Sequence, residues 1–135
     1  MKTMTKLVST FAVSLLLAAC SAKSPEDTAQ KFVSEIYNGN ADAVVAMMHL
    51  VDDADKQKPG VQEILSGKIK ASVAEQKALA EQQGGVESIT AEPAAIDPAD
   101  SNRANVSVTT KFKNGKTDTD RMRLINVDGT WKIRL

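Results

Sequence analysis

The most reactive side chain in this 135-residue chain belongs to Cys20, its only cysteine. A single cysteine cannot form a disulfide within the chain, so its thiol is left for other chemistry. The residues before it, Leu17-Ala18-Ala19, end in two small side chains, as a signal-peptide cleavage site requires. Attachment of a lipid at Cys20 would consume a thiol that is otherwise reactive in an oxidising compartment.

The segment before Cys20 has the parts of a secretory leader. Lys2 and Lys6 give it a positive start, and a mostly apolar stretch of 13 residues follows at 7–19. A membrane-spanning helix needs roughly 20 apolar residues, so this stretch is short for crossing a bilayer. The alternative is an ordinary signal peptide with an incidental cysteine.

The leader and the run ending at Cys20 resemble the lipobox of bacterial lipoproteins. The resemblance implies removal of a signal peptide at 1–19 and a tether at 20–23 that begins with the lipidated Cys20. Members of this class carry a diacylglycerol, and two or more acyl chains anchor a protein stably in a membrane. Ser21 follows the cysteine in place of Asp. By the sorting rule of enteric bacteria, this implies a location in the cell envelope at the outer membrane.

Tyr37 and His49 are the side chains outside the leader that we consider for ligand contact. Tyr37 lies at the end of an expected helix, where its ring also suits the core. His49 is the only histidine and is expected on a second helix, beside Met48. Without a Cys or His partner it predicts no metal site. For His49 a surface or helix-capping position is the simpler interpretation.

Two groups of acidic residues could bind cations. Asp52, Asp53 and Asp55 lack the spacing of a calcium loop, so a solvated loop is the simpler interpretation. Asp118 and Asp120 alternate on one strand and are expected on its polar face, paired with Lys111 and Lys113 of the neighbouring strand or turn. No triad, phosphate loop or paired-carboxylate motif is present, so we expect no catalytic residue and no cofactor.

Charge argues against nucleic acid as a partner. The chain has 17 basic and 17 acidic residues, and removing Lys2 and Lys6 with the leader leaves 15 basic residues and a formal net charge of −2. This charge balance implies no basic face for binding phosphates. Only four aromatic residues remain, too few for a base-stacking platform: Phe32, Tyr37, Phe112 and Trp131.

The first half of the chain predicts three helices. Ser24 and Pro25 begin the first, which ends at Asn38-Gly39. Asn40 begins the second, whose apolar stripe is Val44, Met47, Met48 and Val51. The third covers about 61–83, and Gly67 weakens its middle and could divide it.

The second half predicts four strands joined by turns. Pro93 makes the first, at about 86–96, an edge, bulged or short strand. Strands at 103–113 and 116–127 and a last one carrying Trp131 follow. A two-residue turn at Asp128-Gly129 pairs Leu124 with Ile133 and Met122 with Leu135. A three-residue loop, Lys113-Asn114-Gly115, pairs Val106 with Met122, whereas a two-residue turn would mismatch the apolar faces.

Three helices followed by an antiparallel meander predict one α+β domain at 24–135, with the helices covering the apolar sheet face. The start Ser24-Pro25-Glu26-Asp27 with Asn38-Gly39-Asn40, and the ending Asp128-Gly129-Thr130-Trp131, resemble small bacterial lipoproteins of unknown function with a nuclear-transport-factor-2-like (cystatin-like) domain. The resemblance implies a curled sheet wrapped around the first helix as a cone. It assigns no catalytic residue.

The sequence favours a non-enzymatic, membrane-anchored envelope lipoprotein that binds a small apolar ligand or a protein partner. Pairing of two copies through the outer sheet face is also open. One alternative is an acid–base enzyme of the ketosteroid-isomerase kind, which needs an inward acid, histidine or tyrosine in a water-poor pocket. Another is a surface antigen without a ligand.

Overall fold

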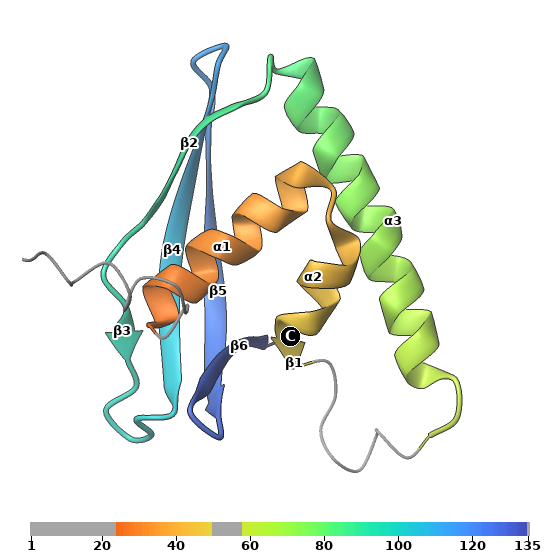
Figure 1. Cartoon of the computed structure of the whole chain (residues 1–135). Coiled ribbons are helices and arrows are strands. Elements are labelled where there is room, and N and C mark those ends of the chain that lie inside the picture. The colour runs from red at the N-terminus through yellow and green to blue at the C-terminus, as the bar shows by residue number, and fades with distance from the viewer. Residues whose placement is uncertain (1–23, 50–57, 135) are drawn as a thin grey trace, which may run out of the picture.

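Three helices and six strands make up the parts of the chain that the computed structural model describes, residues 24–49 and 58–134 (Figure 1). Helix α1 (Pro25–Asn38) lies across one face of the sheet. Helices α2 (Ala41–Ala46) and α3 (Val61–Gln82) pack against the side of α1 that faces away from the sheet. The α+β class with helices covering one sheet face is therefore confirmed. The leader, Cys20, the tether, the Asp52–Asp55 acids, Val51 and Leu135 lie outside the described residues.

Helix α1 has the ends that its sequence predicts. The Ser24 side chain accepts a hydrogen bond from the Asp27 amide at 3.0 Å, and Pro25 occupies the first turn. At the other end Gly39 has φ of +77°, a left-handed conformation that lets its amide and that of Asn40 bond back to the last carbonyls. Six positions of α1 are buried: Pro25, Thr28, Ala29, Phe32, Val33 and Tyr37.

Helix α2 is shorter than its apolar stripe predicts. It ends at Ala46, and Met48 and His49 form strand β1, which pairs in parallel with β6. Two contacts from β6 hold this end: the Ile133 amide donates to the Met47 carbonyl, and Lys132 Nζ donates to the Ala46 carbonyl. The placement of Met48 and His49 on a helix is therefore wrong, because pairing with β6 uses their backbone instead.

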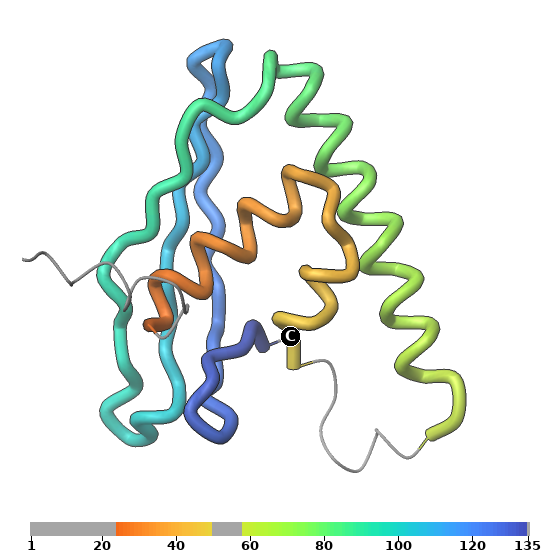
Figure 2. Tube along the Cα trace, in the orientation of Figure 1, coloured from red at the N-terminus to blue at the C-terminus, as the bar shows by residue number. Residues whose placement is uncertain are grey.

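Helix α3 is continuous through Gly67 over 22 residues, so the glycine does not divide it. Only Val73 and Ala80 of this helix are buried, and Ile64 is 61% exposed. Figure 2 shows α3 as the outer layer of the fold, with α1 between it and the sheet. The expected apolar stripe of α3 is therefore only partly used.

The sheet has the order β1-β6-β5-β4-β2, with the short β3 also pairing with β4. The strands are β2 (Val86–Ala91), β3 (Ala95–Ile96), β4 (Arg103–Phe112), β5 (Thr117–Val127) and β6 (Thr130–Arg134). Pro93 lies in the break between β2 and β3, and β2 is irregular between Val86 and Ser88. The expectation of a short or bulged first strand is confirmed, although β1 makes the sheet mixed rather than purely antiparallel.

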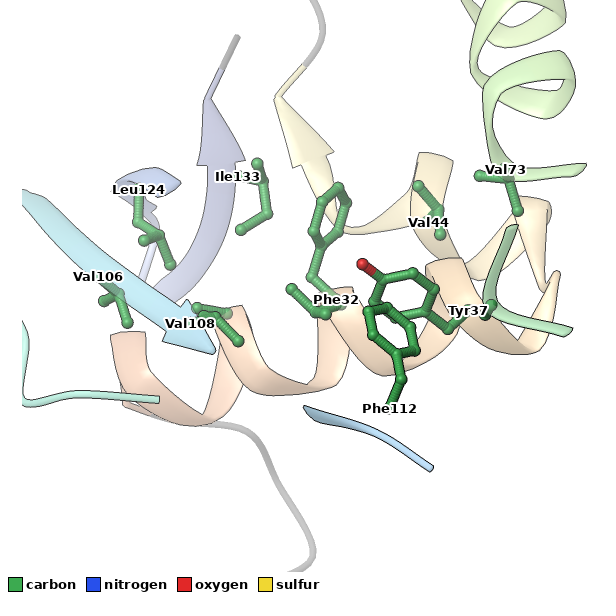
Figure 3. Close-up of a cluster of buried hydrophobic side chains, with 12 residues drawn as sticks. Phe32, Tyr37, Val44, Val73, Val106, Val108, Phe112, Leu124 and Ile133 are labelled. Atoms are coloured by element: carbon green, nitrogen blue, oxygen red, sulfur yellow. The ribbon is translucent and has the colours of Figure 1, made fainter. Parts of the chain in front are cut away.

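The predicted strand registers are confirmed within the described residues, which do not include the Leu135 partner predicted for Met122. Val106 pairs with Met122 across a three-residue loop, in which Gly115 has φ of +88°. Leu124 pairs with Ile133 across the Asp128-Gly129 turn. These pairs place one apolar face of the sheet under α1, which Figure 3 shows as a cluster that includes Val106, Val108, Leu124 and Ile133 beside Phe32.

Trp131 is only partly buried against the core cluster, so its removal should cost less than the roughly 3–5 kcal/mol of a fully buried aromatic side chain.

A polar contact fixes the start of α1. Glu26 Oε1 accepts a 2.7 Å hydrogen bond from the Ala94 amide, in the break between β2 and β3 that contains Pro93. That bond lowers the pKa of Glu26 and ties the start of α1 to the sheet edge.

Candidate functional site

Tyr37 occupies the last turn of α1 and is buried, with 9% of its surface exposed. Its ring meets Phe112 of β4 edge to face, with centroids 5.5 Å apart and planes at 87° (Figure 3). This geometry is favourable for two aromatic rings and fixes the tyrosine on the sheet. The core position expected for the ring is therefore confirmed.

Asp118 and Asp120 lie on the inner face of the sheet, which corrects the sequence prediction. Asp118 is opposite Thr110 and Asp120 is opposite Val108, and both partners have no exposed surface. The cause is strand parity: residues two and four positions before Met122 share its face. Lys111 is opposite Thr117 instead and forms its ion pair with Glu87, 3.3 Å away on the outer face.

A pocket of about 260 Å³ lies where α1, α3 and β5 meet. Buried and half-buried residues of α1 and β5 form its floor, while Asp118, Asp120 and Ser72 are exposed at its rim. Its lining residues are Val33, Ile36, Tyr37, Ser72, Gln76, Asp118, Asp120 and Met122. The pocket therefore has an apolar floor and a polar, acidic rim.

The electrostatics of the pocket follow from this arrangement. Burial raises the pKa of Tyr37, and the negative charges of Asp118 and Asp120 raise it further, against a smaller opposing effect of Thr110. Burial also raises the pKa of Asp120, and the neighbouring Asp118 adds to that shift. Two acidic groups of this pocket, Tyr37 and Asp120, thus have raised pKa values that favour their neutral forms.

A buried hydroxyl adjoins these groups. Thr110 is fully buried, faces Asp118 across the two strands and lies near the Tyr37 hydroxyl. Its Oγ1 nevertheless has no hydrogen-bond partner of ordinary geometry among the described residues. Buried polar atoms without a partner are uncommon in native proteins.

The structure does not bring His49 to this pocket. His49 lies in β1, paired with Arg134 and half-buried, and is absent from the pocket lining. Cys20 lies outside the described residues. Within the described ranges no three His, Cys, Asp or Glu side chains gather as metal ligands would, and no helix there is both long and apolar enough to traverse a bilayer.

A second hollow, of about 520 Å³, runs along the outside of α3. Its lining residues, Gln62, Glu63, Ser66, Gly67 and Lys70, all come from that helix. One helix surface cannot enclose a ligand, so we consider the pocket at Tyr37 the better candidate site.

Comparison with known proteins agrees with the fold. A candidate NTF2-like (nuclear-transport-factor-2-like) transpeptidase from Campylobacter jejuni has 28% sequence identity and a TM-score of 0.73, covering 83% of this chain and 98% of that one. A SEC-C motif containing protein from Rhodopseudomonas palustris has 15% identity and a TM-score of 0.50, covering 90% and 83% of the two chains, and supports the fold alone. A search of curated proteins found no match.

The layered helices and mixed sheet therefore define an NTF2-like domain. Residues 18–134 match the family described as "Domain of unknown function (DUF4878)". The chain belongs to this family, and the NTF2-like domain implied by the resemblance stated from its sequence is confirmed.

Proposed function

We propose that this chain is a lipoprotein of the bacterial envelope, anchored at the outer membrane through Cys20, whose NTF2-like domain binds a small ligand in the pocket at Tyr37. The anchor is supported by the leader and the lone cysteine. The observation that carries the binding role is the pocket itself, about 260 Å³ between α1, α3 and β5. Typical small-molecule pockets begin near 300 Å³, so the ligand is small.

The residues that line the pocket indicate the chemical class of the ligand. An apolar ligand alone would suit Val33, Ile36 and Met122 but would leave the acidic rim without a partner. A ligand with an apolar body and a polar end matches both parts of the pocket. Such an amphipathic ligand differs from the purely apolar ligand expected from the sequence, and its binding requires no protein partner.

Acid–base catalysis is the second candidate function. It is favoured by one observation: Asp120, with a raised pKa, lines the same pocket as Tyr37. The Campylobacter relative is named as a candidate transpeptidase, which would require a nucleophile. Here Ser72 lines the pocket, and none of the described lining residues is a lysine or histidine that could activate it.

The binding role is tested by native mass spectrometry of the protein purified from bacterial membranes. We expect a small bound mass on the wild-type protein and none on Ile36→Trp, because the larger side chain fills the pocket from its apolar wall. Leu79→Trp, at a position of α3 that is 40% exposed, is the matched control and should retain the bound mass. Equal occupancy of wild type and Ile36→Trp, or no bound mass on either, would contradict the proposal.

The anchor is tested separately by Cys20→Ala. We expect this variant to leave the membrane fraction and to lose incorporation of labelled palmitate, because the acyl chains supply the membrane affinity. Recovery of Cys20→Ala with membranes at the wild-type level would rule the anchor out.

A further inference from the structure

The rim of the pocket at Tyr37 carries two negative charges without a basic partner. Among the described residues neither Asp118 nor Asp120 forms an ion pair, and none of the residues lining the pocket is basic. The nearest lysine along the neighbouring strand, Lys111, is already paired with Glu87 on the outer face. The two carboxylates of this rim are therefore available to a cationic group of a ligand that enters from solvent.

The floor beneath the rim is apolar and small. Val33 of α1 is 1% exposed, and Ile36 and Met122 pack against the core cluster. At about 30 Å³ for a water-sized group, a volume of 260 Å³ accommodates roughly nine non-hydrogen atoms. An apolar body of that size would cover the floor and reach the carboxylates with one end.

Thr110 supplies a buried hydroxyl beside the pocket, although it is not one of the lining residues. It lies opposite Asp118 and interacts with the Tyr37 hydroxyl, and its Oγ1 has no partner of ordinary hydrogen-bond geometry among the described residues. A polar ligand group at this end of the pocket would satisfy that oxygen.

We propose that the pocket is selective for small amphipathic amines, with the ammonium group between Asp118 and Asp120 and the apolar body on Val33, Ile36 and Met122. This inference rests on the proposed function, since it names the ligand class of the same pocket. An ammonium group offers three donors and a positive charge, which two carboxylates and a nearby hydroxyl accept. A carboxylate-bearing ligand would meet like charge at the rim and is disfavoured.

Three probes of matched size test the ligand class: phenethylamine, its neutral counterpart 2-phenylethanol, and the anion phenylacetate. The full chain is placed in phosphatidylcholine nanodiscs with ¹³C-methyl-labelled methionine, and empty nanodiscs correct for partitioning of the probes. The methyl signal of Met122 reports on the pocket, and that of Met47, which packs on the core outside it, reports on the fold. We expect saturable shifts of Met122 with an affinity for the amine about fivefold above that for the alcohol, and no binding of the anion.

The Asp118→Asn/Asp120→Asn double variant is expected to lose that fivefold preference while keeping its affinity for 2-phenylethanol. Asp42→Asn, which removes an exposed carboxylate on α2, is the matched control and should keep the preference. An unchanged Met47 signal verifies that the double variant is folded.

The outcomes separate the two proposals. If amine and alcohol bind the wild type equally, or if the double variant keeps the preference, selectivity for amines is overturned and ligand binding in the pocket stands. If no probe shifts Met122 at millimolar concentration, ligand binding in the pocket is overturned as well.

Discussion

Asp120 is the residue whose surroundings differ most from those of an ordinary surface acid. It lies on the sheet face that carries the core, opposite Val108, with the carboxylate of Asp118 nearby and no ion pair among the described residues. Burial and the charge of Asp118 both disfavour its ionised form. A carboxylate in that position is kept at a cost to stability, which is typical of residues that serve a site.

Asp120→Asn is therefore expected to stabilise the fold at neutral pH. The folded-state pKa is raised above 3.8, so between pH 3.8 and that raised value the folded protein holds a proton that the unfolded chain has lost, and stability falls as the pH rises. Below about pH 3.8 both states are protonated and the penalty is absent. Because the side chain is only partly buried and solvent screens its charge, we expect a gain of only about 0.5 kcal/mol, or roughly 2 °C in Tm at pH 7.

Thermal melting of wild type and Asp120→Asn at pH 7 and at pH 3 measures this difference. The gain should be present at pH 7 and should shrink at pH 3, while Asp42→Asn, with its side chain 90% exposed, changes Tm little at pH 7. A lower Tm for Asp120→Asn at pH 7 would show that the carboxylate stabilises the fold instead.

At the scale of elements, most boundaries could be predicted from local signals. The ends of α1 follow from Ser24, Pro25 and Gly39, and both hairpin registers follow from turn residues matched to the apolar faces. Strand β1 could not be predicted, because two residues give no periodicity and their pairing with β6 depends on a distant part of the chain. The face of Asp118 and Asp120 was predictable from their even spacing to Met122, but their charge suggested the solvent side.

Two glycines provide opposite tests of the helices. Gly39 has φ of +77°, and a Cβ there would lie 2.6 Å from Lys77 Cδ. Gly39→Ala should therefore destabilise the fold by about 1–2 kcal/mol. Gly67 lies inside α3 with open space around it, so Gly67→Ala should stabilise by roughly 0.5–1 kcal/mol through helix propensity.

Urea unfolding curves of the two variants measure these changes in the free energy of unfolding, which should decrease in Gly39→Ala and increase in Gly67→Ala. Stabilisation by Gly39→Ala would show that the turn after α1 is not left-handed. Destabilisation by Gly67→Ala would show that α3 is not a continuous helix at that position.

At the scale of the whole molecule, the site exists only because α1 crosses the sheet. Figure 1 shows the crossing of α1 over the sheet. It places residue 37 in one pocket with residues 118 and 120, which are more than 80 positions away in the sequence. Tyr37 could be selected from the sequence as a candidate, but its two acidic neighbours could not be assigned to it. Helical periodicity and strand alternation give the faces of single elements, and contacts between elements depend on how those faces pack.

The shared pocket of Tyr37, Asp118 and Asp120 is the central claim, and Tyr37 is the only tyrosine in the chain. Ultraviolet absorbance of tyrosinate during a pH titration therefore measures its pKa directly, with circular dichroism recorded alongside to verify that the protein remains folded. We predict a pKa above 10.0 in the wild type, because burial and both carboxylates disfavour tyrosinate, and a lower value in Asp118→Asn/Asp120→Asn. A Tyr37 pKa at 10.0 that is the same in the double variant would contradict the claim that these three side chains share one pocket.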